Sequence, residues 1–233
     1  MFGVKRRRGD LSKKAEAFNQ GLEALQVSAS LDENVALMKK LFQDVDVMRY
    51  RFVFHAGREN VAIVFSDGLV NSEIINENIL RPLMSAEALP AGADRMKRMT
   101  NELIHINESE LTSDFRKIVN GVTYGDTVLF ADGCAEAALL STKGFPTRSI
   151  TEPDSERTLA GPREGFTESV MQNISMLRRR ARTNDFKIRQ MTLGRRTQTA
   201  VMVCYFDGVV NQSVLAQLME RLERIDIDGV LDT

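Results

Sequence analysis

Two short segments of this 233-residue sequence carry the same acidic and amide side chains at the same spacing. VAIVFSDGLVN (61–71) and VMVCYFDGVVN (201–211) align without a gap and place four polar residues at matching positions, Asp67, Asn71, Asp207 and Asn211. Polar groups that converge in an apolar concavity can bind a small molecule, so these four form the candidate ligand-binding set. A carboxylate beside a second catalytic group could instead serve a hydrolase or a transferase. Asp-Gly is also a common turn and asparagine a favoured N-cap, so a purely structural role is the competing interpretation.

The second candidate group is cationic and consists of Arg178, Arg179, Arg180, Arg195 and Arg196. Guanidinium groups bind carboxylates and phosphates through paired hydrogen bonds, so this group could present a cationic face to an acidic partner subunit or to anionic lipid headgroups. The alternative is a solvated helix end, where cations face the negative end of the helix dipole. Pro162 and Arg163, in the segment GPREGF, join this candidate coupling region because the proline restricts the backbone that enters the following helix.

Several kinds of chemistry lack their usual sequence signatures. There is no phosphate-binding GxxxxGK[ST] loop, no GxGxxG opening a helix after a strand and no GxSxG nucleophile motif. His55 and His105 have no second histidine or cysteine at metal-ligand spacing, so neither a metal site nor a cofactor is expected. The net charge of -1 and the lack of interleaved basic and aromatic residues argue against nucleic-acid binding. Cys134 and Cys204 are expected to be free thiols.

The elements around the two repeated segments follow one order. Apolar spacing predicts a helix over 32–42, followed by strands at 48–54 and 60–66. The second half repeats this order over the ranges 166–181, 186–193 and 199–206. In its helix, five apolar side chains share one stripe, Phe166, Val170, Ile174, Leu177 and Ala181, and the first four of them are expected to be buried. We interpret the shared order as a duplicated unit of helix, hairpin and helix.

The first unit is expected to continue beyond its repeated part. A short strand is predicted at 102–106, then a helix in which Asn107 and Glu110 have capping-box spacing and Gly121 supplies the C-cap. A second hairpin follows, turning near Asp132-Gly133. In the second unit, IDIDGVLDT (225–233) is expected to correspond to the third strand.

The predicted fold class is mixed α/β, with two related helix, β-hairpin and helix units that each contain a mixed sheet. An N-terminal basic and helical extension is expected over 1–30 and the first α/β subdomain over 31–142. Residues 143–165 hold three of the five prolines and form the predicted linker, followed by a second, C-terminally incomplete subdomain over 166–233. Units joined in this way create a cleft or an interface, and they are expected to move relative to one another if their contact is modest.

Several longer segments carry a family resemblance, GDTVLFADG (125–133), GFPTRSITEP (144–153), GPREGFTESVMQNISMLRRR (161–180), LGRR (193–196) and RIDIDGVLD (224–232). On these segments, residues 31–233 resemble the N-terminal hydrophilic region of the A subunits of bacterial spore germinant receptors, the GerA family. The resemblance implies a non-enzymatic component of a nutrient receptor that triggers spore germination. It implies B and C subunits as partners and an amino acid, sugar or nucleoside as the nutrient.

The resemblance also implies a location. The full-length subunit would lie in the spore inner membrane, with this domain on the cytoplasmic side, facing the spore core. Two roles for the domain stay open. It could bind the nutrient and pass a signal to other subunits, or it could be an assembly domain while the nutrient is bound elsewhere in the receptor.

Overall fold

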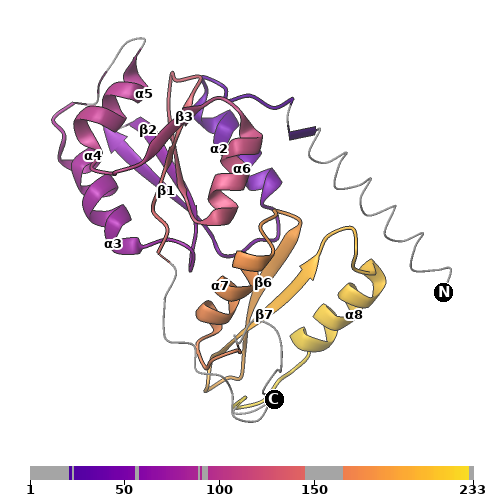
Figure 1. Cartoon of the computed structure of the whole chain (residues 1–233). Coiled ribbons are helices and arrows are strands. Elements are labelled where there is room, and N and C mark those ends of the chain that lie inside the picture. The colour runs from indigo at the N-terminus through magenta and orange to yellow at the C-terminus, as the bar shows by residue number, and fades with distance from the viewer. Residues whose placement is uncertain are drawn as a thin grey trace, which may run out of the picture.

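The computed structural model describes residues 21–22, 24–55, 58–88, 90, 94–144 and 165–230, which form two adjoining units (Figure 1). Most of the expected N-terminal extension, nearly all of the expected linker, and Pro162 and Arg163 lie outside these residues. The domain boundaries expected from the sequence therefore stay predictions.

A five-stranded sheet forms the centre of the first unit. In spatial order its strands are β1 (Met48–His55), β2 (Arg58–Ser66), β4 (Thr127–Ala131), β5 (Ala137–Leu140) and β3 (Ser109–Thr112). Successive residues of β2, which lies between β1 and β4, enter opposite cores, Ala62 and Val64 on one face and Val61 and Ile63 on the other. Both predicted hairpins are confirmed. All strand pairs in this sheet are antiparallel, however, where a mixed sheet was expected.

Helical segments cover both faces of this sheet (Figure 1). On one face lie α2 (Leu31–Leu41) and α6 (Phe115–Tyr124), whose apolar residues pack against β2 and β4. On the other face lie α3 (Ser72–Ile74), the π-helical η1 (Ile75–Leu80), α4 (Arg81–Ser85), α5 (Arg95–Arg98) and the π-helical η2 (Met99–Leu103). The helix predicted over 32–42 is thus confirmed as α2.

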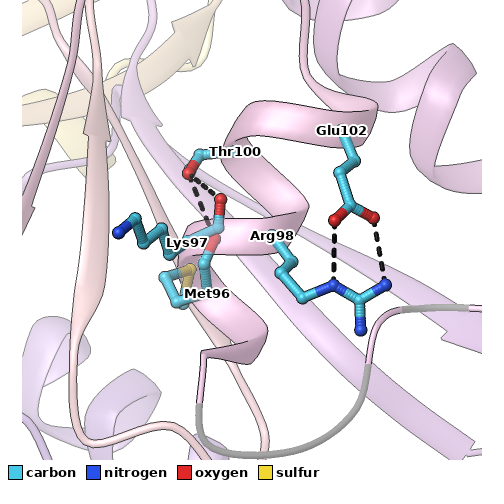
Figure 2. Close-up of polar contacts among 5 residues, drawn as sticks. All are labelled: Met96, Lys97, Arg98, Thr100 and Glu102. Carbon is cyan, nitrogen blue, oxygen red and sulfur yellow. Dashed lines mark hydrogen bonds and ion pairs between the residues drawn. The ribbon is translucent and has the colours of Figure 1, made fainter.

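Figure 2 shows the passage from α5 into η2. The buried hydroxyl of Thr100 is shared between the carbonyl oxygens of Met96, at 3.2 Å, and Lys97, at 2.9 Å. On the exposed side, Arg98 Nε and Nη2 donate to the carboxylate of Glu102 at 2.9 and 3.1 Å, and these bonds lower the pKa of the Glu102 carboxyl. The hydroxyl is therefore satisfied within its own helix, and the exposed pair adds little to stability.

The second unit consists of α7 (Val170–Arg180), β6 (Phe186–Leu193), β7 (Thr199–Phe206) and α8 (Gln212–Glu223). β6 and β7 form a two-stranded antiparallel sheet, which again is not mixed. Among the described residues, the second edge of β7 pairs with no strand, whereas the second edge of β2 pairs with β4.

The two units meet along β6. Ile188 forms a parallel bridge with Val45: its N–H donates to the Asp44 carbonyl at 3.0 Å, and its carbonyl accepts from the Asp46 N–H at 2.8 Å. Asn184 Nδ2 donates to the Leu41 carbonyl at 2.9 Å. Ile174, Phe186 and Ile188 belong to the same apolar cluster as α2 and β2. The contact between the units is thus a hydrogen-bonded junction with a shared core, so the condition of a modest contact, on which the expected relative motion depended, is not met.

The prediction of a strand at 102–106 is wrong. Its first two residues belong to η2, and the edge strand is β3, at Ser109–Thr112, which pairs with β5. Leu103, Ile104 and Ile106 pack into the core from the end of the helical segment. Their apolar spacing suits that position as well as it suits a strand.

The helix that follows also begins and ends later than expected. Asp114 is its N-cap and accepts from the Arg116 N–H at 2.8 Å, so the predicted capping box is wrong. Gly121 lies inside α6, and Gly125 is the C-cap with a φ of +102°. A Cβ at Gly125 would lie 2.8 Å from the Leu69 carbonyl oxygen, so this position needs glycine for both its backbone angle and its space.

The predicted stripe of the second helix is confirmed in part. α7 begins at Val170 with Ser169 as its N-cap, so Phe166 lies before the helix and is 70% exposed, which contradicts its expected burial. Ile174 is buried, whereas Val170 and Leu177 are half-buried.

Candidate functional site

Asp67 is engaged in the turn that follows β2. Its Oδ1 accepts from the Gly68 N–H at 2.9 Å, and its Oδ2 lies 3.1 Å from Arg49 Nη2 on the neighbouring strand. Gly68 has a φ of +79° and packs against Met171 of α7. Asn71 follows as the N-cap of α3, with its Oδ1 accepting from the N–H groups of Glu73 and Ile74.

Asp207 and Asn211 have the same local geometry in the second unit. Asp207 Oδ1 accepts from the Gly208 N–H at 3.0 Å, and Gly208 has a φ of +76°. Asn211 is the N-cap of α8, with its Oδ1 accepting from the first N–H groups of that helix. The structural interpretation of these four residues thus has direct support, while their ligand role and the duplication itself stay predictions.

The capping role gives a measurable expectation. Replacing Asn71 or Asn211 with alanine should lower the free energy of unfolding by about 1 kcal/mol, because the first N–H groups of the helix lose their acceptor. Serine at either position should preserve stability, and alanine at the exposed Asn120 inside α6 should change it by only a few tenths of a kcal/mol in the opposite direction. Chemical denaturation measures all of these variants. Alanine variants as stable as the parent would show that the caps are dispensable.

A cavity of about 530 Å³ lies beside Asp67, between the edge strand β1 and the segment α3–η1. Arg49, Arg51 and Asp67 supply its charged groups. Phe65, Ile75 and Leu80 line it with apolar groups. Of the four residues predicted to bind a ligand, Asp67 lines this cavity, whereas its two arginines were not predicted. The alternation in MRYRFVF was a signal for them, because it places both arginines on one face of a strand.

The arginines at the end of α7 do not form one solvated group. Arg178 is only 1% exposed, so the expectation of a solvated helix end is wrong for this residue. Its Nη1 donates to the Thr183 carbonyl at 3.2 Å, and its guanidinium lies 5.7 Å from the ring centre of Phe186. Arg179 is half-buried and Arg180 is exposed. The apolar stripe missed Arg178 because Phe186 of β6 packs on a side of the helix that the stripe does not include.

Arg195 and Arg196 face carboxylates of the C-terminal segment. Arg195 makes a two-pronged ion pair with Asp226, and Arg196 Nε lies 3.9 Å from Asp228. The backbone N–H groups of both arginines also donate to carbonyl oxygens of residues 227 and 228. The described part of 225–233 therefore lies along the hairpin turn and is not the expected third strand. The coupling role of the arginines stays a prediction. Fewer of their positive charges are accessible to a partner, because Arg178 is buried and Arg195 is paired with Asp226.

The second unit exposes a group of apolar side chains that the sequence analysis missed. We call the following residues the α8 face: Phe206, Val209, Val214, Leu218, Ile225 and Ile227. Each is 40–59% exposed, and together they make up six of the ten exposed large apolar side chains among the described residues. Val214 and Leu218 lie one helical turn apart on α8, which Figure 1 shows at the outer side of the second unit. The sequence of α8, QSVLAQLMERLE, could have predicted this exposure. Its apolar residues occupy more of the helix surface than a two-stranded sheet can cover.

Comparison with known sequences places this chain in a family. A sequence model described as "Bacillus/Clostridium GerA spore germination protein" matches residues 36–233. The chain belongs to the GerA family. The similar proteins include, from Bacillus subtilis, spore germination protein KA (31% identical, covering 89% of this chain and 38% of that protein) and spore germination protein B1 (30%, covering 88% and 42%). The uncharacterized membrane protein YfkQ of the same organism is 33% identical, over 89% of this chain and 40% of that protein.

A solved structure supports the fold of this GerA-family chain. It is the N-terminal domain of the A subunit of the Bacillus megaterium spore germinant receptor GerK3, with a TM-score of 0.61 and 23% sequence identity, over 86% of this chain and 74% of that chain. At this identity the likeness concerns the fold. The chain spans about two fifths of the length of the curated relatives.

Two further properties hold for the part of the chain that the structure describes. None of its helices is long and apolar enough to cross a membrane. Nor does that part contain a group of three or more histidine, cysteine, aspartate or glutamate residues that could hold a metal ion.

Proposed function

We propose that this chain is the N-terminal domain of a spore germinant receptor A subunit, and that it acts in germination as a non-enzymatic assembly and signalling domain. The family match and the likeness to the GerK3 domain support the identity of the domain. The α8 face carries the proposed role, above all through Val214 and Leu218, which are exposed one helical turn apart on α8, because neighbouring exposed apolar side chains can form a contact surface.

The proposed occupant of the α8 face is the remaining polypeptide of the same A subunit. The curated relatives are more than twice as long as the part that this chain matches. The first unit offers a precedent, because the second edge of its hairpin strand β2 is covered by β4 from the same chain. An open strand edge next to exposed apolar residues favours pairing with a further strand.

The junction between the units supports a relay of signal through one body. Because Ile188 is hydrogen-bonded on both sides to residues 44–46, a displacement of the second unit carries the first with it. In this proposal the full-length subunit lies in the spore inner membrane with this domain on the core side, and it works with B and C subunits. Direct binding of the nutrient by this domain is a separate possible role, which the assembly role does not require. A contact of Arg180 with lipid headgroups is part of the proposal.

The test replaces Val214 and Leu218 together by serine in the full-length subunit. Because both side chains are exposed, the isolated chain should keep its stability within about 0.5 kcal/mol. Spores carrying the variant should lose receptor assembly and their response to nutrient, measured by the fall in absorbance of a spore suspension. Met84→Ser is the matched control, because Met84 is 60% exposed on α4 of the other unit. This variant should leave receptor assembly and the response to nutrient unchanged.

A photo-crosslinking residue at position 218 identifies the occupant. We expect adducts within the A subunit itself. Adducts with another receptor subunit would overturn the proposed occupant, and normal germination of the serine variant would overturn the proposed role of the α8 face.

A further inference from the structure

The cavity beside β1 has the dimensions and the wall composition of a small-molecule site. Its volume of about 530 Å³ lies within the range of roughly 300–1,000 Å³ that is usual for ligand pockets. Phe65 of β2 and Ile75 and Leu80 of η1 supply apolar groups, while Ser72 and Asn76 add a hydroxyl and an amide. Apolar walls with a few polar groups favour an organic ligand over a bare ion.

The charges in the cavity favour an anionic ligand. Arg49 and Arg51 are two residues apart on β1, so their side chains lie on one face of the strand. Asp67 neutralises Arg49 through the 3.1 Å ion pair, and Arg49 Nη1 also donates to the Asp46 carbonyl at 2.8 Å. Arg51 makes no ion pair within the described residues and is exposed. The lining therefore carries one uncompensated positive charge, on Arg51.

The neighbouring carboxylate does not compensate Arg51. Glu77, on η1 next to Asn76, forms an i,i+4 ion pair with Arg81. The wall formed by η1 is itself unusual, because π-helical turns are rare and occur often at functional sites. Asp67 then serves to hold the Arg49 guanidinium in place and does not bind the ligand, because its negative charge would repel an anion.

We propose that this cavity binds a small organic carboxylate with an apolar body. The carboxylate accepts hydrogen bonds from the Arg51 guanidinium, with Arg49 beside it, and the apolar body packs against Phe65, Ile75 and Leu80. The site lies in the first unit, whereas the α8 face lies in the second, so this proposal does not depend on the proposed assembly role.

The test titrates the chain with 4-methylpentanoate and with 4-methylpentanamide, which has the same shape without the charge. We expect the carboxylate to bind about tenfold or more tightly than the amide, and Arg51→Gln to weaken carboxylate binding by a similar factor, because a hydrogen bond to a charged group is lost. Arg81→Gln is the matched control, since Arg81 is an exposed arginine that does not line the cavity. Calorimetry gives the affinities, and NMR shifts at residues 65 and 75 give the location.

Three outcomes would overturn the site. The first is equal binding of the amide and the carboxylate, and the second is unchanged affinity in Arg51→Gln with the fold intact by melting. The third is binding of inorganic phosphate at this site as tightly as 4-methylpentanoate, seen as equal competition between them. That result would show that the apolar wall contributes nothing to the affinity. Phe65→Leu serves as a second variant and should weaken 4-methylpentanoate severalfold while leaving acetate binding unchanged.

Discussion

Replacing Ile188 with alanine is expected to destabilise both units together, by about 2–5 kcal/mol. Ile188 is fully buried, forms the bridge to Val45 and belongs to the apolar cluster that contains α2 and β2 residues of the first unit. The cavity left by alanine would therefore lie in the shared core. Urea unfolding should remain a single transition with a lower midpoint.

Ile225→Ala is the control for this prediction, because Ile225 is 40% exposed and its truncation should change stability by less than about 0.5 kcal/mol. Hydrogen exchange followed peptide by peptide reports α2 and α7 separately. Faster exchange in α7 alone, or two separate unfolding transitions, would show that the units fold independently and that the junction does not couple them.

The coupling of the units bears on how a receptor domain of this kind can work. Lobes that close on a ligand need a contact that opens at small cost, and here opening would break backbone hydrogen bonds at residues 44–46 and expose a shared core. A ligand in the cavity beside β1 would instead act within the first unit. The rigid junction would then carry any displacement to the α8 face.

Local sequence patterns were sufficient to predict the features that depend on a single helix, strand or turn. The helix over 32–42 and the strands of both hairpins follow from apolar period alone, and each Asp-Gly-x-x-Asn segment forms the turn and N-cap that its residue types favour. Antiparallel pairing was not predictable in the same way. The direction of pairing depends on which strands become neighbours in the sheet. β2 and β4 are neighbours although the helical segments that cover one face of the sheet lie between them in the sequence.

The candidate site depended on contacts that no local pattern contains. Arg51 becomes a candidate binding residue because η1 forms a wall opposite β1. Arg178 was assigned to solvent from its position outside the apolar stripe, but β6 packs over it. Burial of this kind follows from packing between elements, here of α7 against β6 of the same unit, so a helix considered alone predicts the opposite environment.

Arg178 leads to the second large expected effect. Its Nε and Nη2 have no hydrogen-bond partner among the described residues, and burial lowers the pKa of its guanidinium to about 10. A buried cation without a carboxylate partner is costly because desolvation is not offset by attraction. Replacing Arg178 with methionine, a flexible apolar side chain of similar length, should therefore raise the free energy of unfolding by about 1–4 kcal/mol at pH 7.

The pH dependence separates this cause from better packing. Because burial holds the pKa of Arg178 in the folded protein at about 10, below its ordinary value, the folded state binds fewer protons than the unfolded state at any pH between those two values. The penalty for burying the cation therefore shrinks as the pH rises above about 10. The gain of Arg178→Met over the parent should accordingly be full up to about pH 9 and smaller at pH 11, measured by urea unfolding of both proteins. Arg180→Met, on the exposed side of the same helix, should change stability by under about 0.5 kcal/mol at either pH. A loss of stability in Arg178→Met would contradict the prediction, because it would mean that the guanidinium makes favourable contacts that outweigh its desolvation, among them the hydrogen bond to the Thr183 carbonyl.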